Sequence, residues 1–386
     1  MKRKNKGLLS VFGNSFDEKE IEAVRKVMRS HLVGYGDLVE EFEDKFKKEI
    51  GFKYAVATTG CNTGFWLLLK ALDFKPGSEI VMPNTHFYGI KNVVELFGLK
   101  IRIVDTSLPV PNLSLENLKN NITANTKAII FLEYGGYPIV DIEAMKKYLK
   151  KINRQDVVLL LDAANSPFTK IGHKYSALDY DFAVYSFDMN KILVTGDGGI
   201  VFGNDKKVMN KVRSLSYYGL KGGIKPAYLK SKKKNRSKWW EVEVETPSLK
   251  LAMNNITAGI GLVQLEKIKG FLAKRKNLRK YYLENLKPLE RSGLLSLPQQ
   301  DKKWENSLYF FWIRLKSEKV RNELANFLLK NNIYSTVKYQ PLDEKAHTPN
   351  SFEFYKTSLL LPFHQNISEN ERQDVILQIK HFFNEK

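Results

Sequence analysis

Short apolar runs alternate with helical patterns over the first half of the chain. Apolar residues at helical spacing predict amphipathic helices over 17–30 and 38–49, and the first begins at the acidic segment DEKE. Continuous apolar runs predict strands at 54–58, 80–82, 101–104, 128–132, 157–161, 182–185 and 200–202. Uninterrupted apolar strands with helices between them are typical of a mostly parallel sheet that is covered on both faces. The pattern therefore predicts an α/β fold.

The pattern changes after Lys221. A basic stretch, 221–238, precedes a long helix predicted over 254–285. Further predicted elements are a strand at 308–315, a helix at 318–330, a strand at 333–339 and a closing helix at 368–383 with Ser368 as its cap. This second half is a smaller α+β unit. We expect a large domain over 15–250 and a small C-terminal domain over 251–386.

Cysteine content and the N-terminal segment bear on the compartment. The chain of 386 residues has a single cysteine, Cys61, so it forms no internal disulfide and suits a reducing compartment. The N-terminus, MKRKNKGLLSVFG, is basic, but its apolar run is too short for a signal peptide. No stretch approaches the roughly 20 apolar residues of a membrane span. We expect a cytoplasmic protein that does not enter a membrane.

The chain is strongly basic. It has 62 Lys and Arg residues against 42 Asp and Glu, which gives a formal net charge of +20. Such an excess favours nucleic acid, membrane phosphates or an anionic small molecule as a partner. We expect no nucleic-acid partner, because no zinc-finger spacing, RNP-like string or basic zipper is present. The segment 221–238 has eight basic and no acidic residues, and is either a solvated loop or a loop that faces a phosphate group.

Chemistry-bearing residues follow several of the predicted strands. In α/β sheets, ligands bind at the carboxyl ends of the strands. The first strand runs into the polar turn 59–63 at the start of an apolar helix, where free backbone N–H groups suit a phosphate. Asp162 follows the strand at 157–161, Ser186 follows the strand at 182–185, and Lys191 comes five residues later. Phe87 follows the strand at 80–82.

Each of these residues is common at a strand end, but their order and spacing match the needs of pyridoxal 5′-phosphate (PLP). Its aldehyde needs a lysine for a Schiff base, and its pyridine nitrogen needs a carboxylate to stay protonated. Its phosphate needs N–H groups and a hydroxyl, and its ring needs a flat partner. Lys191, Asp162, the turn with Ser186, and Phe87 meet these four needs.

Several blocks in order resemble the DegT/DnrJ/EryC1/StrS aminotransferase family, the sugar aminotransferases with the aspartate-aminotransferase fold. The blocks are GYGDLVEEFEDKF (34–46), ALDFKPGSEIVMP (71–83), LLLDAANS (159–166), SFDMNKILVTGDGG (186–199), NNITAGIGLVQLE (254–266) and LLLPFHQNIS (359–368). The resemblance runs over nearly the whole chain. It implies a fold with a mostly parallel sheet in the large domain.

The resemblance also implies roles for single residues. The cofactor lysine falls on Lys191, the acid at the pyridine nitrogen on Asp162, the phosphate-binding serine on Ser186 and the stacking aromatic on Phe87. The phosphate turn falls on Cys61, Asn62 and Thr63, and the sequence reads Gly60-Cys61-Asn62-Thr63 where the family usually reads Ser-Gly-Thr-Ala. Asn165 stands where Gln or His contacts the cofactor phenol oxygen.

Other positions depart from the family pattern. Lys250 stands where many members place an Asn from the neighbouring subunit on the cofactor phosphate. A lysine would pair with that phosphate as a point charge. Glu133 and Asp188 replace frequent histidines, and Ala252 replaces a frequent arginine. We expect these three positions to lie where substrate is handled.

The resemblance implies a PLP-dependent aminotransferase that acts as a homodimer. Glutamate is the expected amino donor, and the expected acceptor is the keto group of a nucleotide-linked deoxysugar. A smaller phosphorylated ketone suits the positive charge equally. A PLP-dependent dehydratase is a second alternative, but relatives with that activity replace the lysine with histidine, and Lys191 is present. A sensor that only binds PLP would need neither Lys191 nor Asp162.

Overall fold

The computed structural model describes residues 7–221, 241–299 and 303–384. Within them, the central sheet has the strand order β1 (Tyr54–Thr58), β9 (Gly199–Gly203), β8 (Phe182–Ser186), β5 (Val158–Asp162), β4 (Thr126–Leu132), β2 (Glu79–Pro83) and β3 (Lys100–Val104). Strand β9 is antiparallel to both of its neighbours, and the remaining pairs are parallel. The predicted mostly parallel sheet is confirmed, and it contains all seven strands expected in the first half.

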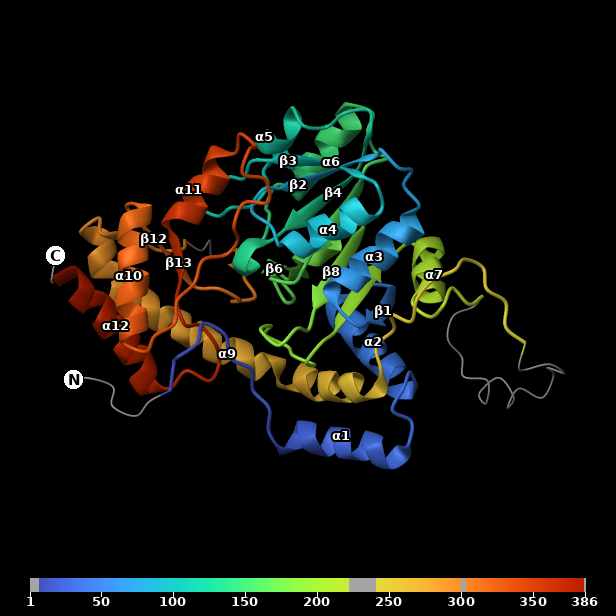
Figure 1. Cartoon of the computed structure of the whole chain (residues 1–386), viewed down its shortest axis with the longest axis horizontal. Helices are drawn as coiled ribbons and strands as arrows, with labels where there is room; N and C mark the ends of the chain where they lie inside the picture. The colour runs from blue at the N-terminus through green and yellow to red at the C-terminus, as the bar shows by residue number, and fades with distance from the viewer. Residues whose placement is uncertain (1–6, 222–240, 300–302, 385–386) are drawn as a thin grey trace.

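Side chains alternate between the two faces of this sheet because successive residues of a strand point to opposite sides. Val56, Met82, Leu160 and Val184 pack with helices α3 (Cys61–Leu72), α4 (Tyr88–Leu96) and α7 (Lys206–Leu215). Their neighbours along the strands pack with α2 (Asp37–Ile50), α6 (Ile142–Lys151) and α9 (Asn255–Arg291). Both faces are therefore buried (Figure 1).

Helix α9 connects this sheet to the C-terminal elements. Its first half packs against α1 (Glu18–Ser30) and α2, and its second half contacts β10 (Leu295–Ser296) and α12 (Glu369–Asn384). Figure 1 shows α9 running along the molecule beneath the sheet, with the C-terminal elements gathered around its far end. Near that end lie α10 (Glu318–Lys330), β12 (Trp312–Leu315) and β13 (Ser358–Leu360). Helix α11 (Pro349–Thr357) packs against α10 and β12.

Helix starts follow the expected capping chemistry. Asp17 accepts a hydrogen bond from the backbone N–H of Lys19 and forms a capping box with Glu20, which fixes the start of α1. Ser368 accepts from the N–H of Glu371, 3.3 Å away, and its own N–H donates to the Glu371 carboxylate, so the predicted cap of α12 is confirmed. Further short elements are α5 (Leu115–Lys119), β6 (Lys170–Ile171), β7 (Lys174–Tyr175) and β11 (Trp304–Glu305).

Two predicted strands are wrong in part or in whole. The strand expected at 308–315 comprises only Trp312–Leu315, because Leu308 adopts a left-handed backbone conformation (φ +56°) and its carbonyl accepts from the buried Arg275. The strand expected at 333–339 is absent from the described structure, where only isolated bridges at Ile333 and Thr336 occur. The chain instead turns toward the sheet, and the hydroxyl of Tyr134 donates to the carbonyl of Lys338.

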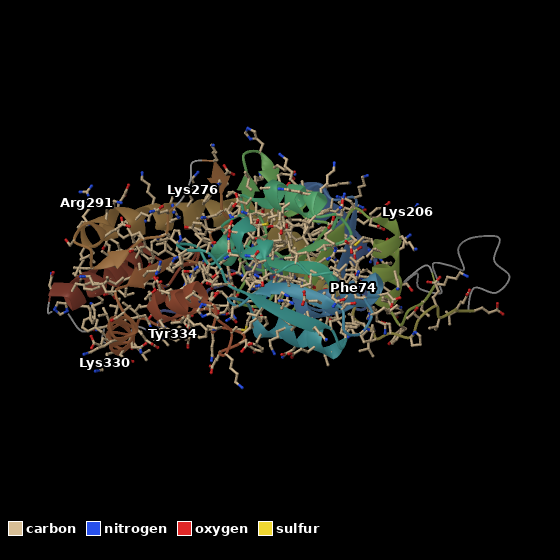
Figure 2. The ribbon with its side chains drawn as sticks, turned by 90° about the horizontal axis from the view of Figure 1, so that it is seen from above. Phe74, Lys206, Lys276, Arg291, Lys330 and Tyr334 are labelled. Carbon is tan, nitrogen blue, oxygen red and sulfur yellow. The ribbon has the colours of Figure 1, made fainter. Side chains whose placement is uncertain are left out.

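Many of the described basic residues lie at the periphery. Lys206 of α7, Lys276 and Arg291 of α9 and Lys330 of α10 project outward, as Figure 2 shows. Most of the segment 221–238 lies outside the described residues, and its role stays a prediction. Lys221, the one residue of it that is described, pairs with Glu243 at 2.9 Å. No helix of the described chain is long and apolar enough to cross a membrane.

Candidate active site

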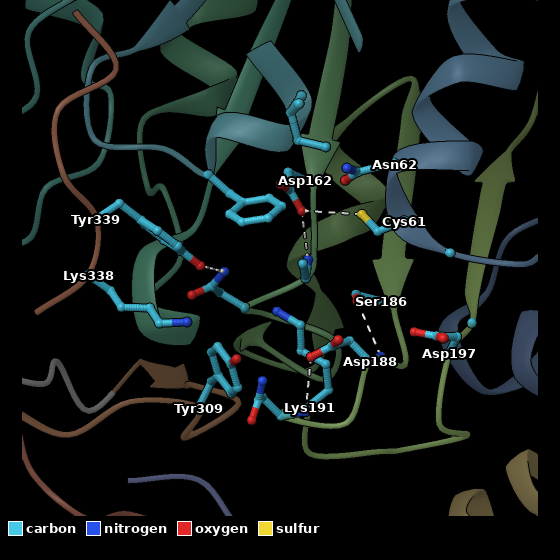
Figure 3. A pocket seen from close by; sticks show the side chains of 17 residues that line it. Cys61, Asn62, Asp162, Ser186, Asp188, Lys191, Asp197, Tyr309, Lys338 and Tyr339 are labelled. Atoms are coloured by element: carbon cyan, nitrogen blue, oxygen red, sulfur yellow. Dashed lines mark hydrogen bonds between the residues drawn. The ribbon is translucent and has the colours of Figure 1, made fainter. Parts of the chain in front are cut away.

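A cavity of about 370 Å³ opens at the carboxyl ends of β5 and β8. Its lining includes seven residues expected from the sequence: Cys61, Asn62, Phe87, Asp162, Asn165, Ser186 and Lys191. The start of α3 and the segments around Tyr309 and Tyr339 complete the wall (Figure 3). The site therefore forms where parallel strands end, as expected for this class of sheet.

Asp162, at the end of β5, is almost fully buried, with 2% of its surface exposed. Its Oδ1 accepts from the backbone N–H of Ala164 at 3.0 Å and lies 3.8 Å from the Cys61 thiol. Its Oδ2 lies 3.7 Å from Nε2 of His86. Burial, with a smaller contribution from Asp162, raises the pKa of the Cys61 thiol well above its usual value, so this thiol stays protonated beside the carboxylate.

His86 is a component of the site that the sequence reasoning missed. Its side chain is fully buried, and Nε2 has no hydrogen-bond partner among the described residues. Burial lowers the pKa of His86, and the nearby Asp162 carboxylate opposes this effect only partly. A signal was available, because His86 directly precedes Phe87 in the segment that follows β2.

Lys191 lies on the loop that follows β8. Its backbone N–H donates to the carbonyl of Asp188 at 2.9 Å, and its Nζ lies 4.7 Å from the ring centre of Tyr309. No carboxylate of the described chain lies within ion-pair distance of this Nζ. The amine therefore faces the cavity over an aromatic ring, available to a ligand.

The turn before α3 presents backbone N–H groups to the cavity. Cys61 and Asn62 begin the helix after Gly60, whose backbone is extended. No side chain caps this helix start, so the backbone N–H groups of the first turn have no capping partner. Gly199 makes this turn possible, since a Cβ there would lie 2.6 Å from the Gly60 carbonyl carbon. Ser186 lines the same side of the cavity. Thr63 does not line it, and its hydroxyl donates back to the Gly60 carbonyl at 2.7 Å.

An amide and several aromatic rings form the opposite side. The Nδ2 of Asn165 donates to the hydroxyl of Tyr339 at 3.2 Å, and the rings of Phe87 and Tyr339 have centres 6.2 Å apart. The Oδ1 of Asn165 is buried without a partner in the described structure. Lys338, Tyr339 and Tyr309 were not expected here, because the sequence assigned them to strands that they do not form.

The residues that depart from the family pattern differ in whether they line the cavity. Asp188 lines the cavity. Glu133 does not line it. Its side chain is fully buried and accepts from the Ser176 hydroxyl at 2.8 Å, and burial raises its pKa to about 7. The expectation that Glu133 handles substrate is therefore wrong. Ala252 is also buried and pairs with Thr58.

Lys250 lies outside the cavity of its own chain. It is exposed, pairs with the backbone of Tyr217, and has its Nζ 5.7 Å from the ring centre of that residue. No group of three or more His, Cys, Asp or Glu side chains suited to a metal ion occurs in the part of the chain that the structure describes.

Comparison with known proteins assigns the chain. The model of the DegT/DnrJ/EryC1/StrS aminotransferase family matches residues 14–380. The chain belongs to this family. It is 28% identical to the dTDP-4-dehydro-2,3,6-trideoxy-D-glucose 4-aminotransferase of Saccharopolyspora spinosa, over 92% of each protein, and 26% identical to the spore coat polysaccharide biosynthesis protein SpsC of Bacillus subtilis, over 94% of each.

Solved structures agree with this assignment. The aminotransferase TlmJ from Streptoalloteichus hindustanus matches 98% of this chain with a TM-score of 0.89 and 27% identity, and all of that protein is covered. The PLP form of the putative sugar aminotransferase Spr1654 from Streptococcus pneumoniae matches 98% with a TM-score of 0.87 at 22% identity, and 99% of it is covered. The chain has the fold-type-I aminotransferase architecture, and it is a PLP-dependent enzyme of the sugar aminotransferase family.

The residues present fit PLP. Free amides at the start of α3 suit its phosphate, and Asp162 supplies a buried carboxylate for a protonated ring nitrogen. The unpartnered Oδ1 of Asn165, a residue that lines the cavity, is typical of a site that is completed by a polar ligand.

Proposed function

We propose that this enzyme transfers an amino group from L-glutamate to the keto group of a nucleotide-linked deoxysugar. The convergence of Lys191, Asp162 and the turn before α3 on one cavity carries the proposal. The relative from S. spinosa is named for an activity on a dTDP-linked 4-keto sugar, which supports an acceptor of that class. The net charge of +20 suits a diphosphate.

Each site residue has a distinct role in this proposal. Bound PLP supplies an aldehyde that links to amines and a ring that withdraws electrons from the adjoining carbon. Lys191 Nζ is the amine that holds the aldehyde at rest and, once displaced by the donor, moves the proton from the donor α-carbon. Asp162 keeps the ring nitrogen protonated. Cys61, Asn62 and Ser186 bind the phosphate.

The remaining residues complete the pocket in the same proposal. Phe87 packs on the ring, and Asn165 hydrogen-bonds the phenol oxygen. Thr63 acts through its backbone, because its hydroxyl is engaged with Gly60. Lys250 reaches the phosphate of the neighbouring subunit, so that the working unit is a homodimer. We place the enzyme in the cytoplasm, where nucleotide-linked sugars and a reduced Cys61 belong.

Chemical labelling tests the assignment of Lys191. Borohydride reduction of the holoenzyme, followed by peptide mapping, is expected to place the cofactor on Lys191, and the Lys191→Arg variant is expected to carry no label. L-Glutamate is expected to discharge the visible absorbance of the wild-type cofactor. Keto acceptors are then screened for its return. Label on another lysine refutes the site, and return with only small phosphorylated ketones replaces the acceptor class.

A further inference from the structure

The cavity contains a second cation that the roles above leave unused. Among the described lining residues, Lys191 and Lys338 are the lysines, and Asp162, Asp188 and Asp197 are the acids. Lys338 Nζ lies 4.8 Å from the ring centre of Phe12 and 5.7 Å from that of Tyr339. No carboxylate of the described chain lies within ion-pair distance of it. The fold therefore holds a partly buried ammonium against aromatic rings, with no carboxylate partner among the described residues.

Hydrogen bonds hold the backbone around Lys338, which places the base of its side chain at the wall of the cavity. The Tyr134 hydroxyl donates to the Lys338 carbonyl, and the Tyr339 hydroxyl accepts from Asn165. Leu342 and Asp343 are in turn held by Asn84 through hydrogen bonds of 3.0 and 2.8 Å. Figure 3 shows Lys338 extending from this segment toward Lys191 and Tyr309. Lys338 thus belongs to the wall beside Asn165, away from the phosphate turn.

The charged form of Lys338 is unfavourable in the folded protein, and a bound anion would stabilise it. Burial and the like charge of Lys191 lower the pKa of Lys338 to about 8, and Asp188 opposes this only in part. An anion that enters beside Lys338 removes both penalties, because it neutralises the ammonium and replaces lost hydration with charge-assisted hydrogen bonds. The site is therefore complementary to a negative group next to Lys191.

The chemistry of transamination places one such group there. The donor nitrogen takes the place of Lys191 Nζ, and the α-carboxylate is attached to the next carbon. A carbon two bonds from that nitrogen lies only about 2.5 Å from it, given the bond lengths of the chain. In a keto sugar, the atom at the position of the donor carboxylate carbon is an uncharged ring carbon. We propose that Lys338 binds the α-carboxylate of the amino donor and thereby selects α-amino acids. This inference rests on the proposed function.

The test compares donors that differ in one carboxylate. L-Glutamate and L-alanine share the α-carboxylate, whereas 4-aminobutanoate is glutamate without it. For the Lys338→Met holoenzyme we expect the concentration that half-discharges the visible absorbance to rise about 10- to 100-fold for both amino acids, the range for loss of a charge-assisted hydrogen bond. The value for 4-aminobutanoate is expected to stay within about twofold. Lys338→Arg is expected to recover part of the loss for the amino acids.

A second readout separates binding from turnover. 2-Methyl-L-glutamate lacks the α-hydrogen, so its spectral titration reports equilibrium binding alone, and its Kd is expected to rise by the same factor. Lys170→Met is the matched control: Lys170 also lies over a tyrosine ring, 4.5 Å from the centre of Tyr175, but does not line the cavity. It is expected to leave all of these values unchanged.

The outcomes distinguish this inference from the proposed function. Unchanged values for both amino acids in Lys338→Met, with a responsive wild type, overturn the role of Lys338 and leave the function standing. A loss for glutamate but not for alanine also overturns it, because Lys338 would then bind the side-chain carboxylate. A wild type that responds to no α-amino acid refutes the donor class, and the inference fails with it.

Discussion

Lys338→Met tests whether the fold keeps an unfavourable cation at its site. Lysine ordinarily titrates near 10.5, and the pKa of Lys338 is about 8 because of burial and the nearby Lys191. At about 1.4 kcal/mol per pKa unit, the difference corresponds to about 3 kcal/mol against the charged form in the fold. Methionine keeps most of the apolar stem and removes the charge. We therefore expect the cofactor-free variant to be more stable than the wild type at pH 7, by up to about 3 kcal/mol.

The pH dependence of this difference follows from linkage. The folded protein releases the Lys338 proton near pH 8, whereas the unfolded chain keeps it until about 10.5, so the unfolded state binds more protons between these values. Wild-type stability therefore rises with pH through this window relative to the variant. The other charged groups that face Lys338 are Lys191, which adds to the effect, and Asp188, which reduces it. Above pH 10.5 the difference is expected to vanish.

The assay is urea unfolding of both cofactor-free proteins, followed by circular dichroism at pH 7 and at pH 10. Each other titrating group is common to the two proteins, so the difference between their unfolding free energies isolates Lys338. A variant that is less stable at pH 7, or a difference that is the same at both pH values, refutes the reasoning. A variant that is more stable but binds amino-acid donors more weakly would show that the fold keeps the Lys338 cation to bind the donor.

Three further predictions concern other parts of the molecule. Asp162→Asn is expected to keep the bound cofactor, but the ring nitrogen loses its charged partner. The loss of visible absorbance on adding glutamate should therefore slow at least about 100-fold in stopped-flow measurements, and a near-normal rate contradicts this. Mixing Lys191→Ala with Lys250→Ala chains is expected to form hybrid dimers with one intact site, so the activity of the mixture should exceed that of either variant; no gain on mixing excludes a shared site. Glu43→Gln is expected to lower the free energy of unfolding by about 3–5 kcal/mol, because Arg213, 2.8 Å from Glu43, is left buried without its charged partner. A loss below about 1 kcal/mol in a urea titration contradicts a stabilising role for this ion pair.

The strands and helices of the first half were predictable because one physical cause dominates them. Except for β3 at the edge, the strands of the central sheet are buried on both faces, so the apolar run has nearly the same limits as the strand. The predicted strand 54–58 is matched residue for residue by β1. Residues at strand ends were predictable for the same reason. Asp162 and Ser186 end β5 and β8, and their places on adjacent parallel strands bring them to one edge of the sheet.

The other wall of the site depends on tertiary contacts that no local pattern contains. The segment LYFFWIRL is apolar except for Arg314, and its first residues are buried by aromatic packing rather than by a sheet. The bend that directs Tyr309 into the cavity is held by Arg275, which precedes Leu308 by 33 residues. Lys338 likewise reaches the cavity because Tyr134 holds its carbonyl. Propensity favours strands in both segments, and these distant partners override it.

Helix α9 restricts how the length of this chain can change. Its 37 residues extend about 55 Å at 1.5 Å per residue. Near its start Gln264 donates to Glu20 of α1, and further along Arg275 donates to the carbonyls of Leu308 and Phe363. One residue inserted between Gln264 and Arg275 would rotate the second half by about 100° and advance it about 1.5 Å. Arg275 would then face away from the loop that bears Tyr309. Insertions and deletions are therefore excluded from the middle of α9, although the chain's surface loops can accept them.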